Sequence, residues 1–382
     1  MEILEYATDR QREYYTAWLE LKSNRQVAKR FNVSETSVRK SIKDLKYKAA
    51  QQGYSPEHNM TKIVPDGFKV KGVSSLYDQD GQLKAQWVKS TADQERQKQL
   101  LIESIEAMAE DLPKVEHREY AAECSDQLLA CYPIGDLHVG MLSWSEETDE
   151  SWDLKIAEEV QCKAMDYLVQ TSPACENAVI INLGDWYHAD NQEGVTTRSG
   201  HSLDMDGRYA KMARVGIKVM RQCIESALNR HKNVRVINVI GNHEDTSSIM
   251  LSICLANVYE KEPRVTIDTS PGAFNYVRHG KVLIGCHHGH SCKPDKLPGV
   301  MATDKAKDWG ETVYRYWYIG HVHHQSLKDY AGVTVESFRT LAAKDAYAHS
   351  GGYRAPRDMK AIIMHKEYGE VSRKTVNPSM LL

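Results

Sequence analysis

The spacing of polar and apolar residues in the first 50 residues predicts a set of short helices. Two capping signals, Thr8-x-x-Gln11 and Ser23-x-x-Gln26, each stand at the start of a helical pattern. The first helix is expected to run to about Leu21, and the second covers about residues 24–31. This part of the chain is therefore expected to form a small all-α module.

A turn and a third helix follow. Asn32 suits the left-handed position of a turn, and Ser34 can cap a helix whose apolar face consists of Val38, Ile42 and Leu45. The run VAKRFNVSETSVRKSI, residues 27–42, resembles a helix-turn-helix in spacing and residue type. In that motif the last helix enters the major groove of DNA, so the expected DNA-binding residues are Arg39, Lys40 and Lys43. A helix-turn-helix that contacts protein instead of DNA is the alternative.

The stretch 51–126 is expected to link two domains. Asp80-Gly81, next to a strand-like run, is typical of the turn of a β-hairpin. Thr91 then precedes a helical stripe that ends before Pro113 and consists of Leu101, Ile105, Met108 and Leu112. We interpret the stripe as a packing face, with a dimer seam as the alternative. The oligomeric state stays open, and a homodimer is one outcome.

From about residue 127 the pattern changes to short apolar strands that end in clusters of Asp, Asn and His. The clusters are DLH (136–138), GD (184–185), GNHE (241–244), HGH (288–290) and GHVH (320–323). The carboxyl ends of strands in α/β sheets lie at the edge where ligands bind. The polar side chains of the five clusters are therefore expected to lie close together.

Charge is distributed unevenly along the chain. The whole chain has a formal net charge of −3, but residues 22–48 contain nine Lys and Arg against two acidic residues. A basic module on an acidic body suggests a polyanionic partner, and DNA is the partner that we expect. A solvated basic helix face is the alternative.

Composition excludes several other classes of protein. Hydrophobic residues make up 41% of the chain, too many for an intrinsically disordered protein. No apolar run approaches the roughly 20 residues of a membrane span, and the charged N-terminus is not a signal peptide. Eight cysteines without a CxxC pair are typical of reduced thiols. We therefore expect a cytoplasmic protein without a membrane partner.

The clusters supply ligands for transition metals. Two carboxylates, one amide and four imidazoles suit a pair of divalent transition-metal ions better than Mg²⁺ or Ca²⁺, which prefer oxygen ligands. Manganese is the expected metal, with iron or zinc as alternatives. Asp136-x-His138 and His321-x-His323 each place two donors on the same side of an extended or tightly turned backbone. Two such pairs and a shared aspartate can hold two ions about 3.5–4 Å apart.

These five clusters, in this order, resemble the motifs of the calcineurin-like metallophosphoesterase superfamily over roughly residues 128–330. The resemblance implies an α/β fold in which two mixed β-sheets pack face to face, flanked by helices, with the metals at one edge. The expected organisation is then a helix-turn-helix in 1–50, a hairpin and helical linker in 51–126, and a metallophosphoesterase catalytic domain in 127–382.

The resemblance also implies roles for individual residues. The first metal would be bound by Asp136, His138, Asp185 and His323, and the second by Asp185, Asn242, His288 and His321. Asp185 would bridge the two ions. The implied reaction is hydrolysis of a phosphoester by a hydroxide between the metals. His243 would be the catalytic residue that protonates the leaving group or stabilises its charge.

One position departs from the superfamily pattern. Many members carry GDxxD, whose second aspartate orients the catalytic histidine, and here His188 stands at that position. Asp190, two residues later, is the expected substitute. Candidates for contact with the substrate phosphate are His290, Arg208, Arg198 and His201. For these four residues, incidental position near the site or on the surface is the alternative.

Several substrates compete. The segments DLHVG and YWYIGHVHH resemble the branch of the superfamily that contains SbcD-type exonucleases, which favours a nuclease acting on DNA. The protein serine/threonine phosphatase branch has arginines in GDxVDRG and RGNHE, and both are missing from Gly184–His188 and Ile240–His243. A small-molecule phosphodiesterase is a further alternative. A non-enzymatic DNA-binding regulator with a vestigial phosphoesterase body is another. The domain combination resembles a bacteriophage or bacterial accessory protein.

Overall fold

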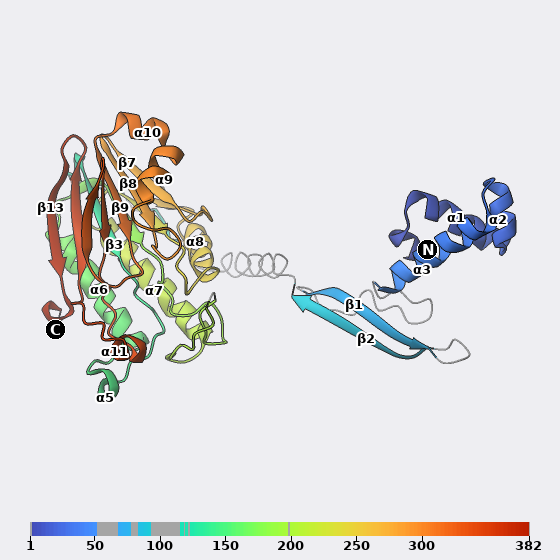
Figure 1. Cartoon of the computed structure of the whole chain (residues 1–382). Coiled ribbons are helices and arrows are strands. Elements are labelled where there is room, and N and C mark those ends of the chain that lie inside the picture. The colour runs from blue at the N-terminus through green and yellow to red at the C-terminus, as the bar shows by residue number, and fades with distance from the viewer. Residues whose placement is uncertain are drawn as a thin grey trace. The chain divides into compact units, whose positions relative to one another are not determined.

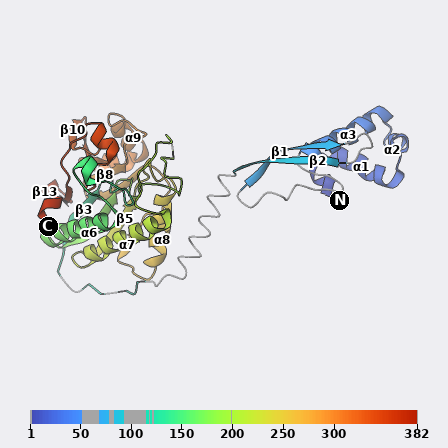
Figure 2. The ribbon, with the colours of Figure 1, turned by 90° about the horizontal axis from the view of Figure 1, so that it is seen from below.

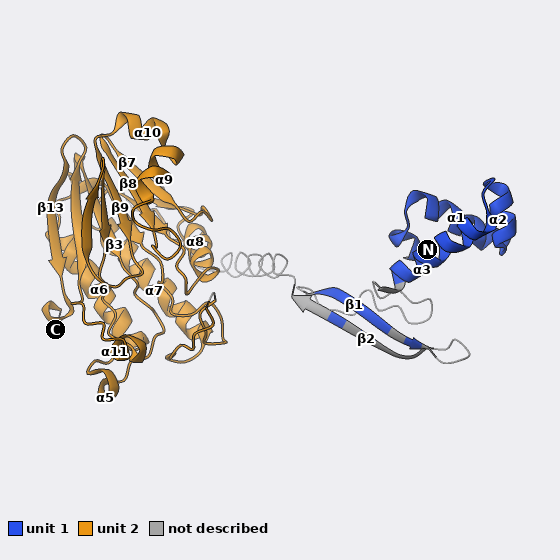
Figure 3. Ribbon diagram, in the orientation of Figure 1, with its two compact units in different colours: residues 1–104 blue, residues 105–382 orange. Residues whose placement is uncertain are grey.

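The computed structural model describes residues 2–51, 68–77, 83–92, 115–117, 119–120, 123–197 and 199–381. The chain divides into two compact units, Met1–Ser104 and Ile105–Leu382 (Figure 3). The domain boundaries predicted near residues 50 and 126 stay predictions. Most of the helix predicted over 91–112 lies outside the described residues.

The first unit begins with a 3₁₀ turn, η1 (Glu2–Tyr6), and three helices, α1 (Asp9–Leu21), α2 (Asn24–Arg30) and α3 (Glu35–Gln51) (Figure 1). The capping box predicted for α1 is present, because Thr8 and Gln11 each accept the backbone N–H of the other. Ser23 and Ser34 cap the next two helices in the same way, with one bond each. These bonds satisfy amides that a helix leaves unpaired at its start.

One apolar cluster joins the three helices. Its buried members are Tyr14, Ala17, Val27, Ala28, Val38 and Ile42. Asn32 makes the turn between α2 and α3 with φ of 51°, the left-handed conformation that its residue type favours. The predicted all-α module is therefore confirmed.

A β-hairpin belongs to the same unit. Strands β1 (Phe68–Tyr77) and β2 (Leu83–Ala92) pair antiparallel, with a register shift between Val70 and Gly72. The hairpin predicted around Asp80-Gly81 is thus present, although the turn itself lies outside the described residues. Thr91, which was expected to precede a helix, belongs to β2.

The second unit contains two β-sheets and flanking helices. The six-stranded sheet has the order β13-β12-β3-β4-β5-β6, and the five-stranded sheet has the order β10-β11-β9-β8-β7. The strands are β3 (Ser125–Ile134), β4 (Cys175–Asn182), β5 (Asn233–Asn238), β6 (Val265–Ile267), β7 (Asn275–His279), β8 (Val282–His287), β9 (Tyr314–Ile319), β10 (Ser326–Tyr330), β11 (Val333–Ser337), β12 (Met359–His365) and β13 (Gly369–Val376). The helices are α5 (Ser145–Thr148), α6 (Leu154–Thr171), α7 (Tyr209–Leu228), α8 (Ser247–Val258), α9 (Leu297–Asp304), α10 (Ala306–Glu311), α11 (Ala346–Ser350) and the 3₁₀ turn η2 (Pro378–Met380).

Helices cover the outer side of each sheet. Figure 2 shows α6 and α7 along one side of the six-stranded sheet and α9 on the far side of the five-stranded sheet. Leu297 and Met301 of α9 are buried against Trp317 of β9. This layering explains why β3 and β4 are almost continuous apolar runs, since strands covered on both faces bury successive side chains.

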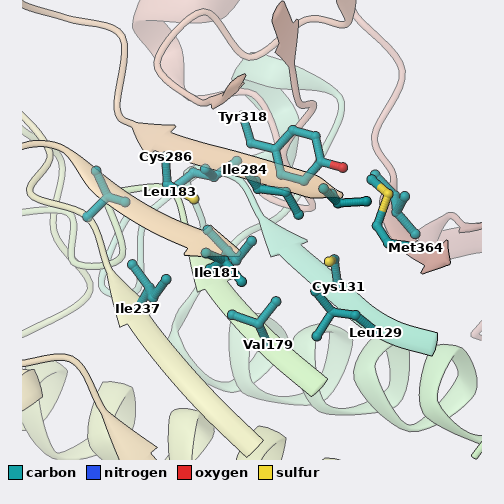
Figure 4. Packing of buried hydrophobic residues seen from close by; sticks show 14 of the residues in the cluster. Leu129, Cys131, Val179, Ile181, Leu183, Ile237, Ile284, Cys286, Tyr318 and Met364 are labelled. Atoms are coloured by element: carbon teal, nitrogen blue, oxygen red, sulfur yellow. The ribbon is translucent and has the colours of Figure 1, made fainter. Parts of the chain in front are cut away.

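The main core lies between the two sheets. Figure 4 shows Leu129 and Cys131 of β3 and Val179 of β4 in one buried cluster with Ile284 of β8 and Tyr318 of β9. Alternate residues of each strand enter this cluster because side chains along a strand point to opposite faces. Burial of each large apolar side chain contributes roughly 1.5–3 kcal/mol.

The strands that precede the five polar clusters are parallel within their sheets. These are β3, β4 and β5 in one sheet and β8 and β9 in the other. Parallel strands end at one edge of a sheet, so the segments that follow them converge. The predicted α/β fold, two sheets flanked by helices after a small all-α module, is confirmed. Within the ranges that the structure describes, no helix is long and apolar enough to cross a membrane.

Candidate metal centre

The polar clusters meet at the edge where the parallel strands end. Asp136 and His138 follow β3, Asp185 follows β4, and Asn242 and His243 follow β5. From the second sheet, His288 follows β8, and His321 and His323 follow β9. All seven side chains predicted to bind metal, and His243, therefore come from the same edge of the sandwich.

The backbone at these positions has an unusual conformation. Among the described residues, eight non-glycine residues have positive φ, and five of them are predicted metal ligands. The five are Asp136 (37°), His138 (49°), Asp185 (52°), His321 (68°) and His323 (53°). A residue with a Cβ is rarely stable in this region, and such strain clusters at functional sites. The backbone of these loops therefore directs the predicted ligand side chains into the site, and contacts with neighbouring residues hold it in this conformation.

Two glycines of the motifs are required by the close approach of these loops. A Cβ on Gly184 would lie 2.6 Å from His288 Nδ1, and one on Gly241 would lie 2.0 Å from Asp185 Oδ1. Gly184 also has φ of 97°. Neither position has room for a side chain, so the glycines of GD and GNHE are explained by packing of backbone against ligand.

Hydrogen bonds tie the strained turns to one another. The carboxylate of Asp136 accepts the backbone N–H of His321, with N···O distances of 2.9 and 3.0 Å. Thr340 Oγ1 donates to the carbonyl of Asp136 at 2.7 Å. Asp185 Oδ1 accepts the backbone N–H of His243 at 2.9 Å. Each ligand loop is thus fixed by a neighbouring loop.

The loops after β4 and β5 are joined by hydrogen bonds in which an acidic side chain of each loop accepts backbone N–H groups of the other. Glu244 is fully buried, and its two oxygens accept the backbone N–H groups of Trp186 and Tyr187, each at 2.8 Å. In the opposite direction, Asp190 accepts the backbone N–H groups of Thr246 and Ser247 and the Ser247 hydroxyl, at 2.7–3.1 Å. This reciprocal arrangement holds Asp185 next to Asn242 and His243.

One group of donors comprises Asp136, His138 and His323. Their ligand atoms lie within 4.8 Å of one another, close enough to hold a metal ion. His138 Nε2 is 3.3 Å from His323 Nε2, and His323 Nε2 is 3.5 Å from Asp136 Oδ1. These are separations that neighbouring ligands of one ion have when each bond is about 2.0–2.2 Å.

A second group comprises Asp185, His288 and His321, again with ligand atoms within 4.8 Å. His288 Nε2 lies 3.1 Å from Asp185 Oδ2 and 3.0 Å from Asn242 Oδ1. His288 Nδ1 donates to the carbonyl of Leu183 at 2.8 Å. Because a carbonyl can only accept, Nε2 is the nitrogen that faces the site, as in histidines that bind metal.

The electrostatics of the second group fit a site for cations. Burial alone would raise the pKa of Asp185, but the charge and hydrogen bond of His288 lower it well below its usual value. Burial would lower the pKa of His288, but Asp185 raises it to about 9. The extra proton on His288 thus supplies positive charge beside the buried carboxylate. Burial lowers the pKa of His138 well below its usual value, with His243 and His323 adding to the effect, which leaves a neutral donor.

His243 faces the same space. Its Nδ1 donates to the carbonyl of His188 at 2.8 Å, so Nε2 is the free nitrogen, and Nε2 lies 4.0 Å from Asp185 Oδ2. The orienting acceptor is therefore a backbone carbonyl. The Asp190 side chain, the expected substitute for that role, bonds to the start of α8 through Thr246 and Ser247.

The side chain of His188 contacts a predicted ligand. His188 Nδ1 lies 3.3 Å from His138 Nδ1, and its ring stacks on His243 with centroids 5.4 Å apart. Burial lowers the pKa of His188 to about 3, with His243 adding to the effect, so the ring is neutral. His138, His188 and His243 form a third group of donors that could hold a metal.

The candidate phosphate contacts are placed differently. The ring of His290 lies beside the second group, with centroids 5.2 Å from His288 and 6.2 Å from His321. Arg208 is exposed and directly precedes α7. Among the described residues, no hydrogen bond joins its side chain to the metal ligands. His201 is exposed in the loop between β4 and α7, and Arg198 lies outside the described residues.

Several residues of the site were not predicted. Glu244 carries a sequence signal, an acid within the buried GNHE motif. Thr340 and Thr197, whose hydroxyl donates to the carbonyl of Asn242 at 3.1 Å, carry none. The bonds of both threonines go to backbone carbonyls of residues far away in the sequence, and such bonds depend on the fold alone.

The predicted DNA-binding residues lie on one helix of the first unit. Arg39, Lys40 and Lys43 are exposed on α3, whose opposite side contributes Val38 and Ile42 to the core. The module therefore presents three cationic side chains to solvent on α3, the helix that the sequence predicts to bind DNA.

Comparisons with known proteins add a likeness of fold. No protein-family model and no curated protein matches the sequence. Among solved structures, a predicted phosphoesterase from Streptococcus pneumoniae is similar at 10% identity, covering 65% of this chain and 97% of that chain with a TM-score of 0.28. An archaeal phosphodiesterase is similar at 14% identity, covering 65% and 99% with a TM-score of 0.33. Vacuolar Protein Sorting 29 from Cryptosporidium parvum is similar at 13% identity, covering 65% and 98% with a TM-score of 0.30.

Proposed function

We propose that the second unit is a dinuclear metal-dependent phosphodiesterase and that its substrate is DNA. One observation carries the proposal. Two groups of Asp and His donors, each with ligand atoms within 4.8 Å, lie at one sheet edge, and within the second group His288 Nε2 contacts Asp185 Oδ2 and Asn242 Oδ1. Imidazoles and carboxylates in this number suit transition metals better than Mg²⁺ or Ca²⁺.

The residues divide between two ions. The first ion is assigned Asp136, His138, Asp185 and His323, and the second is assigned Asp185, Asn242, His288 and His321. Manganese is the metal that we expect, with iron or zinc as alternatives. When bound, two such ions lower the pKa of a water molecule and neutralise charge on a phosphate. Nδ1 of His288, bonded to Leu183, leaves Nε2 toward the ions.

His243 is the proposed proton donor. Its Nδ1–H is held by the carbonyl of His188, so Nε2 can carry a second proton and deliver it to the leaving oxygen of the substrate. The position 4.0 Å from Asp185 Oδ2 places Nε2 next to the ligands without making it one of them in this assignment. His290, beside His288 and His321, is the proposed contact for a phosphate oxygen.

DNA is proposed as the substrate because of the first unit. Exposed Arg39, Lys40 and Lys43 on α3 give the module the charge that a DNA backbone attracts. In this proposal the module brings the chain to DNA, and the metal centre hydrolyses the phosphodiester. The resemblance to SbcD-type exonucleases supports the same substrate.

The test offers three substrates to the manganese-loaded full-length protein: linear DNA, bis(p-nitrophenyl) phosphate and a phosphopeptide. The proposal expects hydrolysis of DNA and of the small diester, and little release of phosphate from the peptide. Hydrolysis of the small diester alone would favour a small-molecule phosphodiesterase. Preference for the phosphopeptide would favour a protein phosphatase, and a protein inactive with every metal would favour the DNA-binding regulator.

A further inference from the structure

The hairpin of the first unit has two unlike faces. The register places the side chains of Lys69, Ser74, Leu76, Trp87 and Lys89 on one face of the hairpin and those of Val70 and Val73 on the other. This follows because directly opposed residues of antiparallel strands point to the same side of the sheet. The register shift between Val70 and Gly72 leaves Lys71 as an extra residue in β1, as in a β-bulge.

Exposure separates the two faces. Val70 and Val73 are half-buried. On the other face Leu76 is 51% exposed and Trp87 is 56% exposed. We call this exposed side, together with the exposed bulge residue Lys71, the ribbon face, and its described exposed members are Lys69, Lys71, Ser74, Leu76, Trp87 and Lys89. An indole and a leucine are thus exposed on the same face as two lysines.

The charged residues of the two hairpin strands have one sign. Strands β1 and β2 contain four lysines and no Asp or Glu. Lys69, Lys71 and Lys89 are exposed. The hairpin also contacts α3, the helix that carries Arg39, Lys40 and Lys43. The first unit therefore carries exposed cationic side chains on α3 and on both strands of the hairpin.

Lysines beside an exposed aromatic ring match the chemistry of an unpaired nucleic-acid strand. Lysines contact its phosphates, and a base stacks on an aromatic side chain whatever its sequence. A second copy of the chain fits the same face poorly, because two ribbon faces in contact would bring the lysines of both copies together, and like charges directly opposed are destabilising.

We infer that the ribbon face binds a single nucleic-acid strand, with a base stacked on Trp87 and phosphates on Lys69, Lys71 and Lys89. The inference rests on the proposed function for the class of partner only. It adds a second binding surface to α3 and predicts that unpaired segments, such as strand ends, are held by the hairpin. Binding by this face does not require metal ions.

The test measures binding of a fluorescein-labelled oligo(dT) strand to the full-length protein by anisotropy, in EDTA so that no hydrolysis occurs. Trp87→Ala is expected to weaken binding roughly 5- to 150-fold, the range for loss of one stacked base. Trp144, 59% exposed in the second unit, supplies the matched control, and Trp144→Ala is expected to bind like the wild type. Trp87→Phe, which keeps an aromatic face, is expected to retain most of the affinity.

The lysines are tested by salt dependence. Replacing Lys69, Lys71 and Lys89 together by alanine should reduce the slope of log affinity against log salt by about 2, since each phosphate contact of a single strand contributes about 0.7. Unchanged oligo(dT) binding in Trp87→Ala, or equal losses in Trp87→Ala and Trp144→Ala, would overturn the inference. A wild-type dimer in sedimentation that Trp87→Ala dissociates would also overturn it, in favour of self-association. Failure of hydrolysis with normal oligo(dT) binding would refute the proposed function without contradicting strand binding by the ribbon face.

Discussion

The metal centre and the three-helix module present their polar side chains in opposite ways. Asp185 and His288 of the centre are buried, and each is bonded to neighbouring loops. Arg39, Lys40 and Lys43 of the module are exposed on the regular backbone of α3. Chemistry on a phosphate needs ligands at fixed separations, whereas attraction of a polyanion needs charge and reach. The two regions therefore differ in what a mutation is expected to cost.

Backbone strain makes the same distinction. Each of the five predicted ligands with positive φ costs of order 1–3 kcal/mol, and such a conformation persists only where surrounding contacts hold it. The bonds from Glu244 to Trp186 and Tyr187 are contacts of this kind, because they fix the two peptide groups directly after Asp185. Helix α3 has no comparable requirement. We expect large and specific effects at the centre and graded effects on the module.

The largest effect is expected for His243→Ala. Loss of a general acid typically lowers turnover by about 10²–10⁴-fold. Both metals should stay bound, because His243 lies outside the two assigned ligand sets. Turnover of bis(p-nitrophenyl) phosphate and metal content by elemental analysis check the two parts. A variant that has lost metal would show that His243 is a ligand and that the third donor group, with His138 and His188, is occupied.

Glu244→Gln should weaken both metal sites. The glutamine presents one amide NH₂ group to a backbone N–H, which leaves a buried donor without an acceptor and lets the Asp185 turn move. Loss of a group that orients a metal ligand typically costs about 10–100-fold in affinity. Titration with Mn²⁺ measures this directly. Weakening of one site only would contradict the role of Asp185 as a shared ligand.

Asp190→Asn is the matched control for Glu244→Gln, because it also replaces a carboxylate that bonds to backbone N–H groups of the facing loop. Asn keeps one oxygen for Thr246 and Ser247, so we expect stability to fall by about 1 kcal/mol, as for a weakened helix cap, and metal affinity to stay near the wild-type value. A loss of turnover as large as that of His243→Ala would instead show that Asp190 orients the catalytic histidine.

Metal affinity should fall as pH falls. The pKa of His288 is raised to about 9 when Asp185 is its partner, so below pH 9 a metal ion must displace a proton from this ring. Protons and metal ions therefore compete for this ring, and the apparent affinity for metal decreases by about tenfold for each pH unit below 9. Titrations with Mn²⁺ at pH 7 and 8 check it. Equal affinities at the two pH values would show that metal binding releases no proton from His288.

The smallest expected effects are on the module. Arg39→Ala should reduce the salt slope of duplex binding by about 0.9, the value for one phosphate contact, and the triple change of Arg39, Lys40 and Lys43 by about 2.7. Arg12→Ala, an exposed arginine on α1, is the matched control and should leave the slope unchanged. Metal content should be the same in all three variants. Duplex affinity that survives the triple change would assign α3 to protein contact.

Much of the fold followed from local signals in the sequence. The cap residues Thr8, Ser23 and Ser34 mark the start of each helix, because the first turn of any helix has backbone N–H groups that need a hydrogen-bond acceptor. The order of apolar strands and polar clusters predicts that the proposed metal ligands lie at one edge, because parallel strands must end together. Gly184 and Gly241 are also visible in the sequence as parts of the GD and GNHE motifs. The structure adds which atoms leave no room for a Cβ at these positions.

Other features could not be predicted. The orienting acceptor of His243 is a main-chain carbonyl, which any residue at position 188 would offer, so the sequence pointed to a side chain at 190 instead. Asp190 reaches the start of α8, a partner set by the packing of two loops 56 residues apart in the chain. The contact between His188 and His138 likewise depends on how strands β3 and β4 lie side by side.

The central claim, a two-metal centre bridged by Asp185, is tested most directly by metal content. The measurement is the ratio of bound Mn²⁺ to protein after loading and removal of free metal, for the wild type and for Asp185→Asn. We predict two ions per wild-type chain, and at most one in the variant, because the amide replaces the shared carboxylate. Fewer than two ions in the wild type, or two ions retained in Asp185→Asn, would contradict the account.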